Sequence, residues 1–289
     1  MKLFSTTTYR LLIALLMTAV LSGCTLGITY RLLPTIAMWS LEDYIDFEKE
    51  QRIATKGALS ELIEWHRYQE LPRYVELLQT LSQFIDRGDA VTLTELEGFS
   101  NQIQASWRRF MNRALPQSVD ILSSLSDDQI TELRENLADD IIEEREELDE
   151  TSPEKTQAKR LKMLTKQAVK LMGKLSPEQE QIIKDWSVAL IPSNEAYLQQ
   201  SIVWNKHFAQ ALEQRKDKAI FLSLLTPLFV YPEELWPPHY REIIESNRSL
   251  TTEVMLQLLH SMNEKQKTKA HNRLNDLIDD LNKLSQIKP

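Results

Sequence analysis

Side chains able to bind or transform a polar ligand are concentrated between residues 39 and 74. Indole, phenol, imidazole, guanidinium and carboxylate groups can together hold such a ligand, and an imidazole beside carboxylates can act as a general acid or base. The members are Trp39, Asp43, Tyr44, Asp46, Trp65, His66, Arg67, Glu70 and Tyr74. This pattern predicts a candidate ligand or partner surface. For the single histidine in it, His66, we favour a packed, hydrogen-bonded role over that of a catalytic base.

The histidine spacing argues against a metal site. A helical zinc site needs a second histidine about four residues away and a third ligand, whereas the histidines here stand singly at positions 66, 207, 239, 260 and 271. Acids gather between Glu143 and Glu154, which favours a solvated helix face over a cation site. We therefore expect no metal and no cofactor.

Motifs for other familiar chemistries do not occur in the sequence. No serine stands in a Gly-x-Ser-x-Gly turn, no glycine-rich loop suits a phosphate, and the sole cysteine, Cys24, lies near the N-terminal end. The sequence therefore favours a noncatalytic protein. An enzyme would require Asp43, Asp46, His66 and Arg67 to converge in one pocket.

The elements that carry these side chains are predicted to be helices. Apolar residues keep helical spacing on both sides of Pro72, from Leu59 to Ile63 and from Tyr74 to Ile85. Because proline lacks an amide hydrogen and clashes with the preceding turn, Pro72 should kink this helix or open a new one. We expect a rigid helical hairpin or a bent helix with residues 65–74 at its corner.

Signals for helix starts recur along the chain. In a capping box, a serine or threonine and a glutamine or glutamate three residues later each satisfy a free amide of the first turn. The pattern occurs at Ser126–Gln129, Ser176–Gln179 and Thr92–Glu95, with a weaker relative at Asn263–Gln266. Glycine is rare, with six in the chain, and no stretch alternates with period two. We therefore predict an all-α fold, a multi-helix bundle of amphipathic helices.

Two segments indicate how the core should form. Ile130, Leu133, Leu137 and Ile141 fall on one helical stripe, which is typical of an amphipathic helix with one buried side. The run 219–231 is strongly apolar and contains a proline. We expect it to form a buried, kinked core helix, because it is too short to span a bilayer.

The N-terminal end carries a targeting signal. Lys2 and Arg10 precede the apolar run 11–21, which is shorter than the roughly 20 residues of a membrane span and therefore indicates a secretory signal peptide. The following Leu21, Ser22, Gly23 and Cys24 resemble the bacterial lipobox. That resemblance implies a diacylglycerol and an acyl group on Cys24, and such paired chains give stable membrane attachment.

The processed chain should therefore have three parts: a signal peptide (1–23), a lipidated cysteine with a short tether (24–34), and a helical domain (35–289). Loss of the first part moves the formal charge from −8 to −10, which argues against nucleic-acid binding. In lipoproteins of this kind an aspartate after the cysteine commonly signals retention at the inner membrane, so Thr25 favours the outer membrane. We expect a Gram-negative outer-membrane lipoprotein that faces the periplasm, with the membrane and envelope proteins as its partners.

Residues along most of the processed chain resemble one uncharacterised family of bacterial lipoproteins, DUF6279. The resemblance is carried by Leu21–Cys24, Tyr30, residues 39–51, residues 65–74 and the helix starts at Ser126 and Ser176. It implies a class and a location but no activity. The Leu-Ser-x-x-Gln helix starts are also similar to the Leu-Thr-x-x-Gln motif of Spy-like periplasmic chaperones, which implies a chaperone role.

Three functions thus stay open. The leading hypothesis is a noncatalytic helical interaction or scaffold module. The second is a holdase-type chaperone or stress-response protein that binds unfolded chains in an apolar groove. The third is an enzyme acting on cell-wall or lipid substrates.

Overall fold

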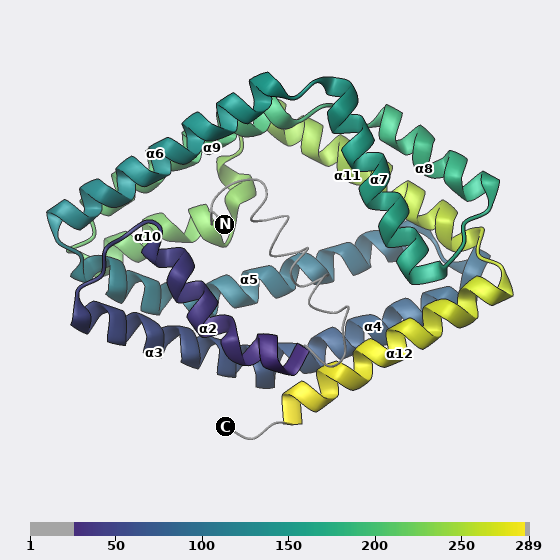
Figure 1. The fold of residues 1–289 in the computed structure, drawn as a ribbon, viewed down its shortest axis with the longest axis horizontal. Coiled ribbons are helices and arrows are strands. Elements are labelled where there is room, and N and C mark those ends of the chain that lie inside the picture. Colours follow the sequence, from purple (N-terminus) through teal and green to yellow (C-terminus); the bar gives the residue numbers. More distant parts are fainter. Residues whose placement is uncertain (1–25, 287–289) are drawn as a thin grey trace. The chain divides into compact units, whose positions relative to one another are not determined.

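The computed structural model describes residues 26–286, and every regular element in that range is a helix (Figure 1). This confirms the all-α prediction. The α-helices are α2 (Leu26–Glu42), α3 (Lys49–Trp65), α4 (Leu71–Arg87), α5 (Leu93–Ser124), α6 (Asp127–Glu150), α7 (Pro153–Met172), α8 (Pro177–Ala189), α9 (Asn194–Glu213), α10 (Lys218–Phe229), α11 (Pro238–His260) and α12 (Glu264–Gln286). Shorter elements are the π-helical turn η1 (His66–Glu70) and the 3-10 turns η2 (Gly88–Ala90) and η3 (Pro232–Leu235). The signal peptide, its cleavage motif at Leu21–Gly23 and Cys24 lie outside the described residues.

The chain forms two compact units, each assembled from three separate segments. Among the described residues, unit 1 comprises 26–69, Ala105–Leu148 and Asn194–Pro238, and unit 2 comprises Glu70–Gln104, Asp149–Ser193 and 239–286. The helical domain expected for residues 35–289 therefore contains two cores, each built from segments far apart in sequence.

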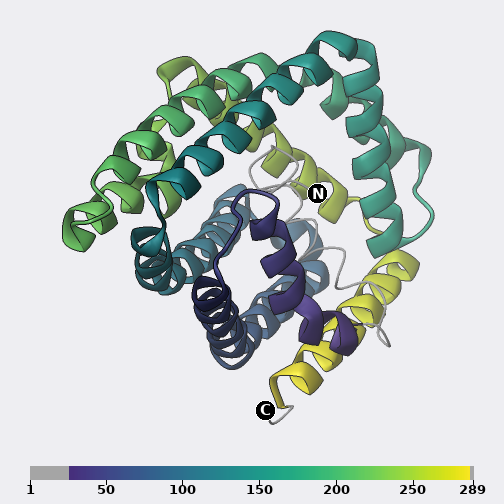
Figure 2. The ribbon, with the colours of Figure 1, turned by 60° about the vertical axis from the view of Figure 1, so that its left-hand side comes forward.

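In unit 1, helix α2 folds back along α3 to form a hairpin (Figures 1 and 2). The connection between the two helices is residues 43–48. Helix α2 already begins at Leu26, so most of the segment expected as a tether, residues 24–34, is helical.

Helix α10 supplies much of the core of unit 1. Phe221 and Leu225 are fully buried, and Pro227 lies inside the helix, in line with the buried, proline-containing helix predicted for residues 219–231. Leu224, on another side of the helix, is partly exposed.

Two tryptophans from other helices bind the last turn of α10. Trp107 Nε1 donates to the carbonyl of Phe229 at 3.1 Å, and Trp204 Nε1 donates to the carbonyl of Leu228 at 3.2 Å. These carbonyls have no partner within their own helix because the helix ends there. Both indoles therefore bind carbonyls at the helix end, and the ring of Trp204 also packs against the core.

In unit 2, α4 packs along α12, and α7 packs against both α8 and α12. The core includes the buried side chains of Ile85, Ile183 and Leu274. No helix within residues 26–286 is both long and apolar enough to cross a membrane.

The segment around Pro72 is helical on both sides of the π-helical turn η1. Pro72 lies in the first turn of α4, where its missing amide hydrogen is not needed. Glu70, just before α4, keeps α-helical backbone angles, so the chain stays helical through η1 into α4. A hairpin in this region turns at residues 43–48, whereas residues 65–74, expected at the corner of a hairpin or of a bent helix, are helical throughout.

Candidate functional site

The structure divides the predicted surface into two groups at opposite ends of α3. Asp43, Tyr44 and Asp46 precede that helix, whereas His66 and Arg67 follow it. Helix α3 contains 17 residues, which at 1.5 Å per residue is about 25 Å. The two acids therefore do not form one site with the histidine and the arginine.

In the group before α3, Tyr44 and Asp46 form hydrogen bonds that hold the α2–α3 connection against α6. The hydroxyl of the buried Tyr44 donates to Asp140 Oδ2 at 2.5 Å, and Asn136 Nδ2 donates to the carbonyl of Tyr44 at 3.0 Å. The backbone amide of Asp46 donates to Glu132 Oε2 at 3.1 Å. These contacts give the connection a defined conformation.

The group after α3 is built around the buried His66. Its Nδ1 lies 2.8 Å from the hydroxyl of Tyr30, and its ring stacks on that of Tyr30 and meets the edge of Phe110. The guanidinium of Arg67 lies 5.3 Å from the Tyr30 ring centre, within cation–π range. These contacts support the packed, hydrogen-bonded role that we favoured for His66, because they join α2, η1 and α5.

The other predicted residues differ in their access to solvent. Trp65 and Tyr74 are half-buried. Glu70 is 1% exposed, with Arg73 at 3.9 Å. Trp39 on α2 is instead 63% exposed. A large aromatic side chain this open to solvent is available to a partner.

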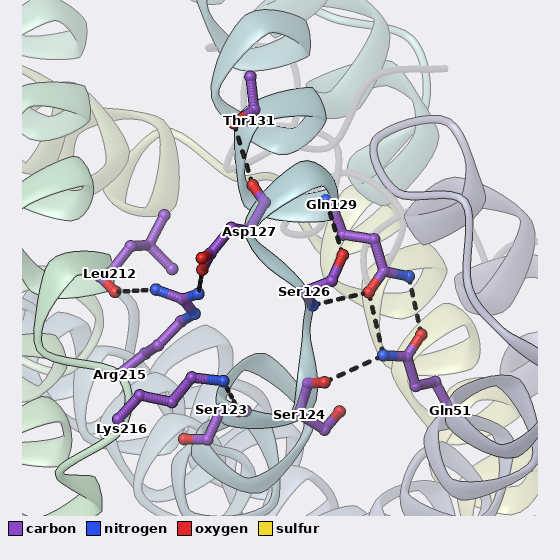
Figure 3. A network of polar contacts seen from close by, with 10 residues as sticks. All are labelled: Gln51, Ser123, Ser124, Ser126, Asp127, Gln129, Thr131, Leu212, Arg215 and Lys216. Carbon is purple, nitrogen blue, oxygen red and sulfur yellow. Dashed lines mark hydrogen bonds and ion pairs between the residues drawn. The ribbon is translucent and has the colours of Figure 1, made fainter.

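A polar joint that the sequence analysis missed connects the starts of α3 and α6 in unit 1 (Figure 3). Gln51 and Gln129 each complete a capping box, and their amides bond to each other at 3.0 and 2.8 Å. Gln51 Nε2 also donates to the carbonyl of Ser124, and Gln129 Nε2 donates to that of Asp46. Each helix start is thus bound both to its own glutamine and to that of its neighbour.

Unit 2 contains the same joint between the starts of α8 and α12. Gln179 and Gln266 bond to each other at 3.0 and 2.8 Å, and their Nε2 atoms donate to the carbonyls of Ser261 and Lys174. In both units the carbonyl acceptor lies two residues before the N-cap residue of the neighbouring helix. Since neutral amides are neither acids nor bases, this repeated joint fixes helix positions and performs no proton transfer.

The helix-start signal for Gln129, Gln179 and Gln266 was present in the sequence and is confirmed. Gln51 follows a glutamate cap at Glu48, which is a less recognisable pattern than serine or threonine. The pairing itself has no local signal, because its members stand 78 and 87 positions apart.

A serine, a histidine and an aspartate meet between α4 and α12 in unit 2. Ser82 Oγ lies 2.8 Å from His271 Nδ1, and Asp86 Oδ1 lies 2.9 Å from His271 Nε2. Hydrolytic triads use these residue types together with amide donors for an oxyanion. Ser82 lies inside α4, where the neighbouring amides bond to carbonyls one turn earlier. The three side chains are therefore suited to linking two helices and not to acyl transfer.

The carboxyl groups with a lowered pKa lie at helix starts or in ion pairs. Hydrogen bonds from Arg87, and then from Thr92, lower the pKa of Glu95 to about 2. A hydrogen bond to Ser152 at the start of α7 lowers the pKa of Glu154. Across residues 26–286, no three side chains of the metal-binding types gather in a way that could hold a metal ion.

A shallow apolar groove lies between α6 and α9 in unit 1. Its volume is about 440 Å³, and its lining includes Ile141, Ile142, Ile202 and Phe208. Ile142 and Ile202 are 56% and 41% exposed. Of the predicted stripe of α6, Ile130, Leu133 and Leu137 are buried, whereas Ile141 is half-buried.

Comparison with known proteins gives a family but no activity. The profile of the family of unknown function DUF6279 matches residues 43–241. The match includes residues 65–74 and the Ser126 and Ser176 helix starts, whereas Trp39 and Cys24 precede it. No curated protein and no solved structure matches the chain. With more than half of its length matched, the chain belongs to the DUF6279 family.

Proposed function

We propose that this protein is a lipoprotein of the Gram-negative envelope, anchored in the outer membrane by lipid on Cys24, with a noncatalytic helical body that binds another envelope protein. The observation that carries the binding role is the apolar groove between α6 and α9. Its exposed isoleucines offer the nonpolar contact that protein partners bury. The residues that an enzyme hypothesis requires lie at opposite ends of α3.

The lipid anchor is tested by metabolic labelling with radioactive palmitate. The wild-type chain should incorporate label, and Cys24→Ser should incorporate none, because Cys24 is the sole thiol of the chain. An unlabelled wild-type chain, in cells where a known lipoprotein is labelled, would contradict the anchor.

The membrane that holds the protein is tested by separating inner and outer membranes on a density gradient. Wild-type protein should sediment with the outer membrane, and Thr25→Asp should move toward the inner membrane. Recovery of the wild-type protein with the inner membrane would contradict the proposed location.

The groove is tested by a photoreactive amino acid at Ile202. Ile191 outside the groove is a matched control, because both side chains are 41% exposed. We expect a discrete protein adduct from position 202 in intact cells and none from position 191. The absence of an adduct at 202, or the same adduct at both positions, would remove the groove as a partner site.

The same groove supports a second candidate, a holdase-type chaperone, because an apolar groove can also bind an unfolded chain. Excess purified protein should then suppress aggregation of a denatured client, and Ile142→Glu should weaken that suppression. Equal aggregation with and without the wild-type protein would exclude this role.

A further inference from the structure

We infer that the outward face of α2, marked by Leu32 and Trp39, lies on the surface of the lipid bilayer that holds Cys24. This inference rests on the proposed lipid anchor and adds a second, noncovalent contact with the membrane. The occupant of this face is thus the headgroup region of a phospholipid bilayer.

The first support is the exposure of large apolar side chains on one side of α2. Leu32 is 49% exposed and Trp39 is 63% exposed. Residues seven apart lie on the same helix face, two turns from each other. Tyr30 and Met38 are buried instead, and the Tyr30 hydroxyl reaches the carbonyl of Ile63 in α3.

The second support is charge. Between Leu26 and Leu41 the sole charged residue is Arg31, which is exposed. The acid that ends the helix, Glu42, is paired with Arg52 at 2.7 Å. The whole chain is acidic, with a formal charge of −8, so anionic headgroups repel most of its surface. The charge of helix α2 is therefore compatible with a membrane surface, whereas the overall charge of the chain is not.

The third support is the length of chain between the anchor and the helix. One residue, Thr25, separates Cys24 from the first residue of α2. At no more than about 3.6 Å per residue, the start of the helix must stay within roughly 7 Å of the anchored cysteine backbone. Whatever the rest of the protein does, this end of α2 stays at the bilayer surface.

A helix held there can cross the bilayer or lie along it. Helix α2 has 17 residues and carries Pro34 inside, and it falls among the helices that cannot span a membrane. Tryptophan prefers the interface, where its ring is in an apolar layer and its N–H remains hydrated. The position of Trp39 fits a helix that lies along the surface.

The test uses the lipidated full-length chain with Trp39→Cys, labelled by an environment-sensitive fluorophore. Since lipid blocks Cys24, the introduced thiol is the one free to react. The protein is reconstituted in vesicles of phosphatidylethanolamine and phosphatidylglycerol containing a lipid with a nitroxide near the top of its acyl chain. Val188→Cys is the matched control, because Val188 is 64% exposed on α8.

We expect about threefold greater fractional quenching at position 39 than at position 188, since an interfacial helix buries its apolar face at the headgroup boundary. Equal quenching at the two positions, in vesicles to which the protein is bound, would overturn the inference and leave the anchor intact. Protection of position 39 from aqueous iodide in native membranes, without quenching by the lipid nitroxide, would assign this face to a protein and also overturn it. Protein that fails to float with the vesicles would refute the anchor, and the inference with it.

Discussion

At the scale of single residues, Gln179 shows how a polar side chain can be completely buried. Its Oε1 accepts from the amide of Ser176 and from Gln266, and its Nε2 donates to Gln266 and to Ser261. Gln179→Met keeps the length of the side chain but removes these bonds. It leaves Gln266 buried with fewer partners, so we expect the free energy of unfolding to fall by about 3 kcal/mol. Urea unfolding followed by circular dichroism measures this.

Gln181→Met, on the same helix, is the control for that experiment. Gln181 is exposed and bonds to Asp185 one turn away. Its replacement should change the free energy of unfolding by less than about 0.5 kcal/mol. Similar losses from both variants would mean that the joint contributes no more than a surface contact.

Glu95 provides a second prediction at this scale. Its pKa of about 2 lies below its ordinary value of 4.5, chiefly because Arg87 donates to its carboxylate. A lowered pKa stabilises the folded state above pH 4.5, and that contribution is lost as pH falls toward 2. Glu95→Gln should therefore be less stable than wild type at neutral pH, and the difference should disappear near pH 2.

Unfolding of both proteins across this pH range, with carboxyl titration by NMR, measures the effect. In an Arg87→Gln background the Glu95→Gln difference should shrink, because the principal donor is gone. A carboxyl of Glu95 that titrates at an ordinary pH in the wild-type protein would refute the prediction.

At the scale of elements, two glycines should respond to alanine in opposite directions. Gly173 ends α7 with φ of 88° and ψ of −146°, a backbone region that is essentially restricted to glycine and costs other residues about 1 to 3 kcal/mol. An added Cβ would also lie 2.9 Å from Lys269 Cδ. Gly57 lies inside α3 with nothing within 4 Å of an added Cβ. We expect Gly173→Ala to lower the free energy of unfolding by about 1 to 3 kcal/mol and Gly57→Ala to raise it by up to about 1 kcal/mol.

Thermal unfolding of the two variants beside wild type measures these changes. Because the substitution is the same, a general effect of the added methyl group is controlled. A stabilised Gly173→Ala would show that the end of α7 tolerates a side chain, contrary to its backbone geometry.

Features of the fold that depend on neighbouring residues could be predicted from the sequence, whereas features that depend on contacts between distant segments could not. The helix starts at Thr92, Ser126 and Ser176 depend on residues within one turn, and each is confirmed. The face of α6 that becomes the groove could not be predicted, because Ile141 continues the same apolar stripe as the buried Leu137. Burial there depends on how far α9 covers α6, which no periodicity encodes.

The candidate site was predictable to a smaller extent. The sequence favoured a packed role for His66, whose side chain is buried and hydrogen-bonded, but it grouped that residue with Asp43 and Asp46, at the other end of α3. Proximity in sequence implies proximity in space within a turn or a loop, and an intervening helix abolishes it. The partners that do meet across helices, such as Ser82 with His271, are 189 positions apart.

At the scale of the whole molecule, the order of segments sets how the chain can fold. Unit 1 takes Ile45 from its first segment, Leu133 from its second and Phe221 from its third, and all three are buried in one core. Unit 2 is likewise built from three segments, as Ile85, Ile183 and Leu274 show. The stretch of chain that connects two successive segments of one core belongs to the other core. Each core therefore needs contacts between residues distant in sequence, which makes its closure entropically expensive.

A truncation tests this dependence. A chain of residues 25–193 lacks the third segment of both units. In unit 1 it loses buried side chains that include Phe208, Leu212, Phe221, Leu225 and Leu228. Burial of each contributes about 2 kcal/mol, or roughly 10 kcal/mol together, which is comparable with the 5 to 15 kcal/mol typical of a whole domain. We expect residues 25–193 to show no cooperative urea transition, whereas residues 25–289 show one. A sigmoidal transition in the truncated chain would mean that two segments suffice for a core, and that the third packs on a body already folded.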